Sequence, residues 1–386
     1  MSSLSNTTNK KSMTSIFSSI DDPRKPYNQK HKFMDIVAIV ILATLAGADS
    51  WDEMVTWANS EIDWLKTFLS LDNGIPSHDT LNRVFQMIDP EQLHSAFREW
   101  IAAIAKNLQG VVAIDGKTIR RSRETISNTK PVHIVSAWST ELSLVLGQTR
   151  TDVKSNEITA IPKLLSQLEI AGCIVTIDAM GTQHAIADKI VSKSADYILC
   201  LKENQEQLYQ DVKLYFETEV FTKPKSELEK DNCYYKNYCN EHGRYELREY
   251  YIVHDVSWMQ QRTEWNKLNA IGARHSRVEE NGVITENTQY MIISRKNMSA
   301  EEFGKSQRGH WGIENSLHWC LDIAFSEDSC RKRAGNAAEN MNVIRHLCTN
   351  LLKQEKTCKL GLKGKRKKCG WEPDYMCKVL TTVDEA

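Results

Sequence analysis

The first hundred residues carry apolar side chains at the spacing of helices. His31 to Leu45 is one predicted helix, and Ser50 or Asp49 caps a second helix that follows it. The residues ahead of these helices are rich in Ser, Thr, Asn and Lys and lack an apolar period. We therefore expect a polar, disordered leader over residues 1–19 and a helical N-terminal domain over residues 20–105.

A third helix in this domain has a well-marked start. Pro76 stops the preceding segment, and Ser77 can cap a helix over His78 to Met87 whose apolar residues share one face. The polar face carries Asn82 and Arg83, which suit contacts to phosphates and base edges in the binding of DNA ends. An ordinary solvated helix face is the alternative, because a helix-turn-helix arrangement cannot be seen in one sequence.

Beyond residue 105 the pattern changes to short apolar strands. Three β-like runs broken by polar turns predict an antiparallel meander, over Val111 to Asp115, His133 to Ser139 and Leu144 to Thr151. An alternation then follows, with a helix at 161–170, a strand at 173–178, a helix at 182–193 and a strand at 197–202. Three strands followed by alternating helices and strands is the order of a ribonuclease H-like sheet. Residues 106–217 are therefore the first part of such a core.

The second half of the chain interrupts this core and then returns to it. Residues 218–295 are aromatic and charged without helical periodicity, which predicts a mostly β insertion. Helical patterns at 301–322 and 336–352 place residues 296–353 in a helical second part of the core. The predicted fold class is α/β: a ribonuclease H-like catalytic core, with a mixed sheet flanked by helices, interrupted by the insertion and preceded by the helical domain.

Composition and charge narrow the function classes. The chain has 386 residues, 41% of them hydrophobic, and a net charge of −1. No apolar run is long enough to span a bilayer and no secretory signal precedes the first helix, so we expect a cytoplasmic protein with no membrane partner. Its ten cysteines contain no CxxC spacing, which favours reduced thiols.

Positive charge gathers near the C-terminus. Lys353 to Lys368 holds eight Lys or Arg residues and one Glu, a local charge of 8 − 1 = +7. Such a run can bind phosphates through counterion release, or can be a solvated segment without a partner. Residues 354–386 are accordingly expected to form a basic C-terminal tail.

Two aspartates occupy matched positions after apolar strands. Asp115 follows Val-Val-Ala-Ile and Asp178 follows Ile-Val-Thr-Ile, so both are expected at the edge of the sheet where α/β folds bind ligands. A single such aspartate is more often a turn or cap residue. The matched pair favours a metal site over a turn or cap role, because two carboxylates so close together require a cation.

A third acid is expected from the helix after the insertion. Glu314 lies there among polar donors, on a helix that Trp311, Leu317 and Leu321 are expected to anchor. The alternatives, Glu327 and Asp328, are expected to pair with the basic cluster at 331–333 instead. Three carboxylates suit Mg²⁺ or Mn²⁺, and two ions are expected.

The spacing of His310, Glu314 and His318 superficially resembles a zinc site. However, the HExxH order is missing, and the two histidines would lie about 12 Å apart along the helix. A phosphate-facing role is the alternative. The full set of expected DNA contacts is Lys117, Arg120, Lys202, Asn204, Arg308, His310, Trp311, Asn315 and His318, together with Asn82 and Arg83.

Three motifs carry a family resemblance. They are Ala-Ile-Asp-Gly-Lys from Ala113, Ile-Asp-Ala-Met-Gly-Thr-Gln from Ile177 and His-Trp-Gly-Ile-Glu-Asn-Ser-Leu-His-Trp from His310. With further matches along nearly all of the chain, the sequence resembles the H-repeat-associated insertion-sequence transposases of the DDE superfamily. The resemblance implies a ribonuclease H-like domain and a divalent metal, with Asp115, Asp178 and Glu314 as catalytic residues and metal ligands.

The family's activity supplies further expectations. The resemblance implies cut-and-paste transposition on double-stranded DNA, at the inverted-repeat ends of the element and at its target, by a homodimer. Many related enzymes carry Arg four residues before the last acid and Lys seven after it, whereas this chain has His310 and Leu321 there. Two alternatives stay open: a degenerate or domesticated DNA-binding protein, and a structure-specific nuclease of the same fold.

Overall fold

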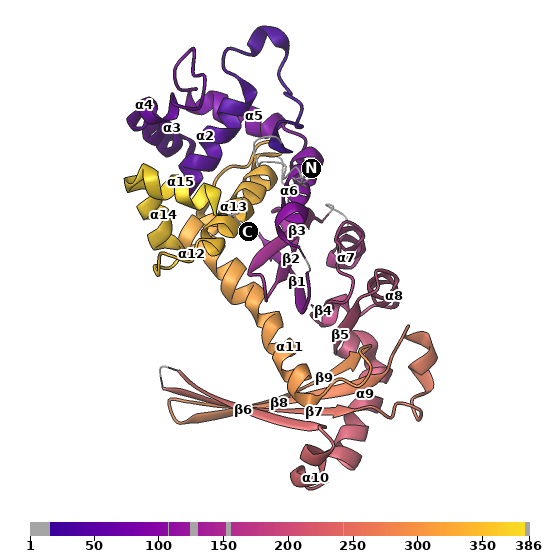
Figure 1. The fold of residues 1–386 in the computed structure, drawn as a ribbon. Coiled ribbons are helices and arrows are strands. Elements are labelled where there is room, and N and C mark those ends of the chain that lie inside the picture. The colour runs from indigo at the N-terminus through magenta and orange to yellow at the C-terminus, as the bar shows by residue number, and fades with distance from the viewer. Residues whose placement is uncertain (1–15, 107, 124–129, 152–155, 242, 383–386) are drawn as a thin grey trace, which may run out of the picture.

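A mixed sheet of nine strands runs through the molecule (Figure 1). The computed structural model describes residues 16–106, 108–123, 130–151, 156–241 and 243–382. The strand order is β3-β2-β1-β4-β5-β9-β8-β7-β6. The first five strands are β1 (Val111–Thr118), β2 (His133–Ser139), β3 (Leu144–Arg150), β4 (Ile174–Ile177) and β5 (Asp196–Leu201). β1 to β3 form an antiparallel meander, and β4 and β5 run parallel to β1, which confirms the predicted ribonuclease H-like core.

The insertion extends this sheet instead of forming a separate body. Its four strands form two antiparallel hairpins: β6 (Tyr234–Glu241), β7 (Arg244–Val253), β8 (Ala270–Glu280) and β9 (Val283–Ile293). The last strand, β9, pairs antiparallel with β5 of the core. The predicted β content of residues 218–295 is therefore confirmed, while its continuity with the core sheet was not foreseen. Figure 1 shows the two hairpins reaching well beyond the core.

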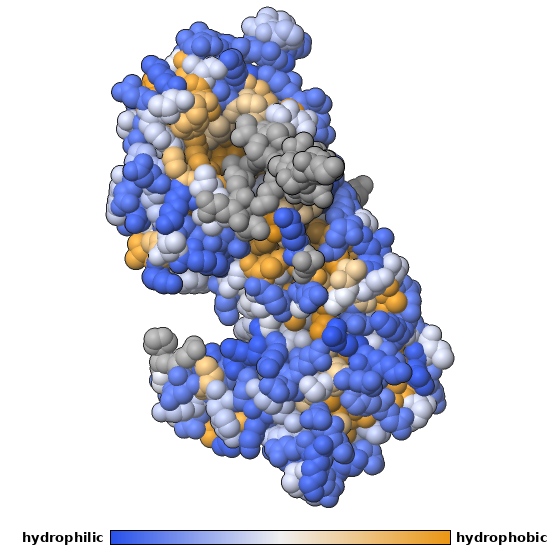
Figure 2. Space-filling view, in the orientation of Figure 1, coloured by the Kyte–Doolittle hydropathy of each residue, from blue (hydrophilic) through white to orange (hydrophobic). Residues whose placement is uncertain are grey.

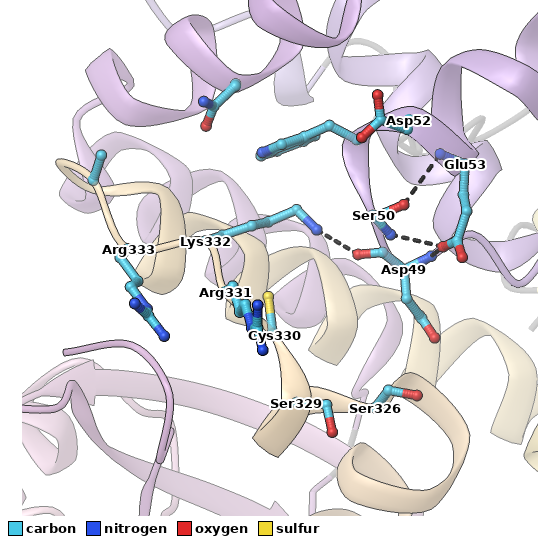
Figure 3. A pocket seen from close by; sticks show the side chains of 13 residues that line it. Asp49, Ser50, Asp52, Glu53, Ser326, Ser329, Cys330, Arg331, Lys332 and Arg333 are labelled. Carbon is cyan, nitrogen blue, oxygen red and sulfur yellow. Dashed lines mark hydrogen bonds between the residues drawn. The ribbon is translucent and has the colours of Figure 1, made fainter. Parts of the chain in front are cut away.

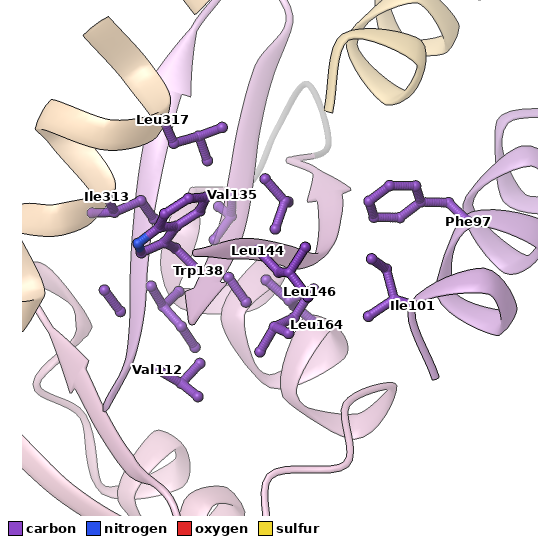
Figure 4. Packing of buried hydrophobic residues seen from close by; sticks show 14 of the residues in the cluster. Phe97, Ile101, Val112, Val135, Trp138, Leu144, Leu146, Leu164, Ile313 and Leu317 are labelled. Atoms are coloured by element: carbon purple, nitrogen blue, oxygen red, sulfur yellow. The ribbon is translucent and has the colours of Figure 1, made fainter. Parts of the chain in front are cut away.

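Helices cover both faces of the sheet. α7 (Glu157–Ser166) and α8 (His184–Ser192) lie on one face, whereas α11 (Ala300–Ile313) crosses the other (Figure 1). α9 (Glu206–Tyr215) and α10 (Lys225–Lys230) lead into the insertion, with a π-helical turn at Phe216–Val220 between them. Figure 4 shows Trp138 of β2 packed beside Ile313 and Leu317, and all three side chains are buried.

The N-terminal helices start where their capping residues predict. They are α2 (Phe33–Leu45), α3 (Trp51–Ser60), α4 (Ile62–Leu65), α5 (His78–Met87) and α6 (Pro90–Ile104). Ser50 forms a capping box with Glu53, and the Ser77 side chain accepts from the Thr80 N–H. None of the described helices is long and apolar enough to cross a membrane.

The C-terminal region corrects two expectations about the chain ends. It forms α12 (Trp319–Phe325), α13 (Ala337–Gln354), α14 (Leu362–Trp371) and α15 (Pro373–Thr381). α14 packs against α2 and α13, and α13 packs against α2, α5 and α6, so residues of the predicted tail join the N-terminal helices in one helical lobe. At the other end, Ile16 and Phe17 are buried in the core, so the leader is at most residues 1–15, which lie outside the described residues.

Two cations of the basic run are used inside the fold, whereas Lys356, Lys359, Lys363 and Lys367 are exposed. Lys365 is buried and donates to the Leu352 carbonyl at 2.9 Å. Arg366 is buried as well, and it donates to the Thr44 carbonyl at 2.9 Å and to Asp49 at 2.8 Å. These two cations hold α14 against the rest of the helical lobe, since their donors are satisfied within the fold. They are therefore not available to DNA.

Candidate active site

Asp115 and Asp178 lie side by side on the sheet. β1 and β4 are parallel and pair Ile114 with Ile177, so the two following aspartates stand on adjacent strands, about 4.8 Å apart in the pairing direction. β1 continues to Thr118, which places Asp115 inside the strand and not at its end as predicted. The predicted meeting of the two acids is nevertheless the result of this register.

The electrostatics of the pair show an excess of negative charge. Burial raises the pKa of Asp115 to about 7, and the charges of Glu157, Asp178 and Glu314 add to the effect. A hydrogen bond of 2.8 Å from the Gly116 N–H opposes it. Burial also raises the pKa of Asp178, again with a contribution from Glu157. The arrangement therefore favours binding of a cation at neutral pH.

Glu314 stands at a break in its helix. α11 ends at Ile313, and Glu314–His318 form a π-helical turn before α12 continues. Single π-helical turns inside helices occur frequently at functional sites, because they re-aim side chains. The expectation of a regular helix through Glu314 is therefore corrected. Leu317 and Leu321 are buried as predicted, but Trp311 is 46% exposed and does not anchor the helix.

The two histidines of this segment lie inside the protein. His318 places its Nδ1 atom 3.4 Å from the Asp115 carboxylate, and burial lowers its pKa to about 4. His310 shares a 3.0 Å hydrogen bond with the Thr176 hydroxyl, and burial lowers its pKa to about 4 as well. Both imidazoles are therefore neutral at pH 7, and their contacts position the acids and the sheet. By contrast, Arg308 and Asn315 are exposed on the same segment.

Glu157 is an acid of the site that the sequence did not reveal. It begins α7, and its carboxylate meets His133 at 2.7 Å, while the other ring nitrogen of His133 contacts the Thr118 hydroxyl at 2.8 Å. A side chain at Gly116 would collide with this carboxylate, so the glycine of the Asp-Gly-Lys motif makes room for it. In the sequence, Glu157 looks like an ordinary acid in the first turn of a helix.

Lys117 joins the strand of Asp115 to the segment after Glu314. Its Nζ atom lies 2.8 Å from Asp322, 3.3 Å from Glu327 and 3.3 Å from Asp328. Because three carboxylates already pair with it, this cation serves the fold and is not free to meet a phosphate as the sequence predicted. Arg120 is 81% exposed and contacts Asp328 at 3.1 Å.

The two rival acids are occupied by cations. Glu327 is fully buried, where the Arg345 guanidinium lies 3.2 Å away and Asn342 donates at 2.9 Å. Although burial acts in the opposite direction, the charges of Arg345 and Lys117 hold the pKa of Glu327 below its usual range. Asp328 pairs with Lys117 and Arg120, so the predicted pairing occurs with different cations from those at 331–333.

A cavity of about 540 Å³ opens beside Asp178. It is lined by Asp178, Ala179, Met180, Lys202, Glu203, Asn204 and Tyr209. Lys202 is exposed there, and its charge partly opposes the rise that burial causes in the pKa of Asp178. Asn204 donates to the Ala179 carbonyl at 2.9 Å and so fixes the loop that follows Asp178. The sheet edge thus brings these predicted residues together around the acid.

A second, larger cavity lies in the helical lobe (Figure 3). Its volume is about 740 Å³, and it is lined by residues 49–53, by Asn82, and by Ser326 and residues 329–334. The Lys332 ammonium lies over the Trp51 ring, 4.6 Å from its centre, and donates to the Asp49 carbonyl. Arg83 is exposed on the same helix as Asn82. The predicted DNA-end helix therefore borders, through Asn82, a cavity lined by three acids and three cations.

The donor chemistry of the acidic site suits a hard cation. Among the described residues, no group of three or more His, Cys, Asp or Glu side chains is already arranged to hold a metal ion. However, carboxylate oxygens are the ligands that Mg²⁺ prefers, and burial, with the neighbouring acids, raises the pKa of Asp115 and so makes its charged form costly without a counter-charge. Asp115, Asp178 and Glu314 are thus chemically suited to a divalent metal.

Comparison with known proteins identifies the family of the chain. Residues 106–351 match the family model described as Transposase DDE domain, and residues 14–101 match the model described as DDE_Tnp_1-associated. The chain is 38% identical to the H repeat-associated putative transposase YhhI of Escherichia coli K12, over 96% of this chain and 98% of that protein. It is 39% identical to the putative transposase YncI of Escherichia coli O157:H7, over 97% of this chain and 95% of that protein.

A solved structure is also similar in outline. The piggyBac transposase synaptic complex with hairpin DNA aligns over 96% of this chain and 77% of its own, with a TM-score of 0.44 and 10% identity. The family model spans most of the chain, and the full-length relatives share more than a third of its residues. The resemblance drawn from the three motifs is therefore confirmed: the chain belongs to the family of DDE transposases.

Proposed function

We propose that this protein cuts DNA at the inverted-repeat ends of an insertion sequence and joins those ends to target DNA. Asp115, Asp178 and Glu314 are the catalytic acids of this proposal and hold two divalent metal ions, Mg²⁺ or Mn²⁺. The observation that carries it is that Asp115 and Asp178 follow matched positions on adjacent strands, where burial raises the pKa of both and the charges of Asp178 and Glu314 add to the rise at Asp115. Such a site attracts metal and not substrate phosphate directly.

The chain's own side chains prepare this site. His318 and the Gly116 N–H fix the Asp115 carboxylate, while Lys117 holds the segment after Glu314 against β1. When bound, the metal ions supply activation of the attacking water or 3′-hydroxyl and stabilisation of the leaving oxygen. Glu314 is favoured over Glu327 as the third ligand because Glu327 is already buried between Arg345 and Lys117.

DNA would approach along exposed donors near the acids. Lys202 lines the cavity beside Asp178, and Arg308 and Asn315 are exposed on the helix that leads to Glu314. In the helical lobe, Asn82 lines the larger cavity and Arg83 is exposed on the same helix, and both are proposed to read the element end. Because transposition joins two ends, we include a homodimer on DNA in the proposal.

The test is cleavage and strand transfer by the purified full chain. The substrate is linear DNA carrying both flanks of the gene, incubated with Mg²⁺ and a target plasmid. Asp115→Asn, Asp178→Asn and Glu314→Gln are each expected to abolish cutting while leaving binding intact, and Asp328→Asn is expected to keep it. Cutting by Glu314→Gln together with loss of cutting in Asp328→Asn would refute the choice of the third acid. Cutting without joining would identify a nuclease instead.

A further inference from the structure

Arg274 is an almost fully buried cation without a partner. It lies in β8 with 7% of its surface exposed, and its Nε atom is buried with no hydrogen-bond partner. Among the described residues, none forms an ion pair with its guanidinium, whereas the neighbouring Arg248 is paired with Glu246. Burial lowers the pKa of Arg274, and the charge of Arg248 acts in the same direction.

An unpaired buried cation is costly for the free protein. Desolvation of a charge is offset by a counter-charge or by hydrogen bonds, and the guanidinium of Arg274 has no ion pair among the described residues and no hydrogen-bond partner at its Nε atom. Nearby arginines of the insertion illustrate the usual solution: Arg277, on the same strand, lies 3.6 Å from Glu286 and is half exposed. The missing partner of Arg274 is therefore expected to come from outside the chain.

The sheet register places Arg274 on the same face of the sheet as the catalytic acids, three strands from the end of β4. β5 pairs Cys200 with Met291 of β9, and Met291 pairs in turn with Gly272 of β8. Since Asp178 follows β4 opposite Cys200, the row of paired positions runs from Asp178 to Gly272. Arg274 stands two residues further along β8 and so on the same face of the sheet, because side chains alternate with a period of two.

An exposed aromatic ring lies beside this guanidinium. The Arg274 guanidinium carbon is 5.9 Å from the centre of the Trp311 ring, and Trp311 is 46% exposed on α11, three residues before Glu314. In Figure 1, α11 runs from the insertion towards the helical lobe, and Figure 2 shows the surface hollowed between the hairpin tips and that lobe. Arg274 therefore sits under the helix that delivers the third acid.

We propose that Arg274 of the insertion and Trp311 of α11 form a DNA phosphate-binding site on the face of the sheet that carries the catalytic acids. This inference rests on the proposed function, since it names a substrate contact of that same site. A guanidinium offers donors in a fixed fork that match two phosphate oxygens, and stacking on an indole keeps that fork in place. The phosphate would provide the counter-charge that the fold withholds.

The experiment measures how DNA binding depends on salt. The full chain binds a labelled random-sequence duplex in EDTA, so that no cutting occurs, and log K is plotted against log salt concentration. Arg274→Gln is expected to lower the slope by about one unit, the contribution of one phosphate contact. Arg277→Gln, on the same strand but paired and facing the other way, is the matched control and is expected to keep the wild-type slope.

Two further measurements separate a binding role from a structural one. Arg274→Gln is expected to melt at the wild-type temperature or above it, because an unpaired buried charge is removed. Trp311→Ala is expected to weaken binding without changing the slope, because it carries no charge. A wild-type slope in Arg274→Gln, or a fall in its melting temperature, would overturn the inference alone. Failure of the wild-type chain to bind any duplex would overturn the proposed function with it.

Discussion

Replacing Lys117 with Met tests whether this cation holds the active site together. The Nζ atom contacts three carboxylates on the segment after Glu314, at 2.8 Å from Asp322 and 3.3 Å from both Glu327 and Asp328. Methionine keeps the length and apolar stem of the side chain but removes the charge. The substitution therefore leaves buried negative charge facing an apolar group, which is the costly way to break an ion pair.

The expected loss of stability can be bounded from these contacts. Breaking a buried pair costs about 3–5 kcal/mol when the remaining charge has no other partner. Here Glu327 keeps Arg345 and Asn342, while Asp322 and Asp328 are 33% and 26% exposed and regain water. We therefore expect a loss of about 2 kcal/mol, below the range for a charge left without any partner. Cleavage should fall too, since β1 loses its link to the segment after Glu314.

The assay is urea unfolding followed by tryptophan fluorescence, with a surface pair as control. Lys163→Met removes a cation that is 59% exposed and 3.9 Å from Glu91, and should cost less than about 1 kcal/mol. The salt slope of DNA binding should not change in Lys117→Met, whereas a phosphate contact would lower it by about one unit. Equal stability of the two variants, or a lowered salt slope in Lys117→Met, would refute the structural role of Lys117.

Two further predictions concern pH and the basic helix. In metal-free protein, Asp115 has a pKa of about 7 against 3.8 when unfolded, so the folded state binds more protons between these values and stability falls as pH rises from 4 to 8. The free energy of unfolding should fall by about 4 kcal/mol at most. Measured by urea unfolding with EDTA, this fall should be absent in Asp115→Asn. Identical pH profiles of the wild-type chain and Asp115→Asn would contradict the prediction. Lys365→Met and Arg366→Met should each lower the melting temperature and leave the salt slope of DNA binding unchanged. Lys367→Met, at an exposed position of the same helix, is the control and should keep the melting temperature. A lowered slope without destabilisation in Lys365→Met or Arg366→Met would restore the phosphate-binding interpretation.

Local signals account for the elements that the sequence predicted well. Pro76 and Ser77 act on their immediate neighbours, and α5 begins and ends where they and the apolar period indicate. The strands that carry Asp115 and Asp178 are apolar runs between polar turns, and the parallel pairing of β1 with β4 follows from the order of elements. The family motifs contain both aspartates and Glu314, which is why the three acids could be named.

Long-range pairing explains what the sequence did not reveal. Lys117 and Asp322 are 205 residues apart in the chain, and no residue near Lys117 in the sequence shows whether it pairs with carboxylates of the fold or contacts a phosphate. Likewise, all the charges of the basic segment Lys353 to Lys368 were counted as free. Arg366, however, donates hydrogen bonds to Thr44 and Asp49, which come from the other end of the chain. Burial depends on which segments meet, and a count of charges along the chain does not contain that information.

The helix α11 links the insertion to the catalytic acids. At its start, Phe303 is fully buried against Tyr250 of β7, with ring centres 5.9 Å apart. Further along, the Thr140 hydroxyl donates to the Gly309 carbonyl at 3.0 Å, and His310 contacts Thr176 of β4. One helix is thus fixed at one end by the insertion and at the other by the core sheet, and Glu314 follows directly on it. Since β9 also pairs with β5, the insertion supports the candidate active site, and the position of Glu314, the proposed third acid, relative to Asp115 depends on it.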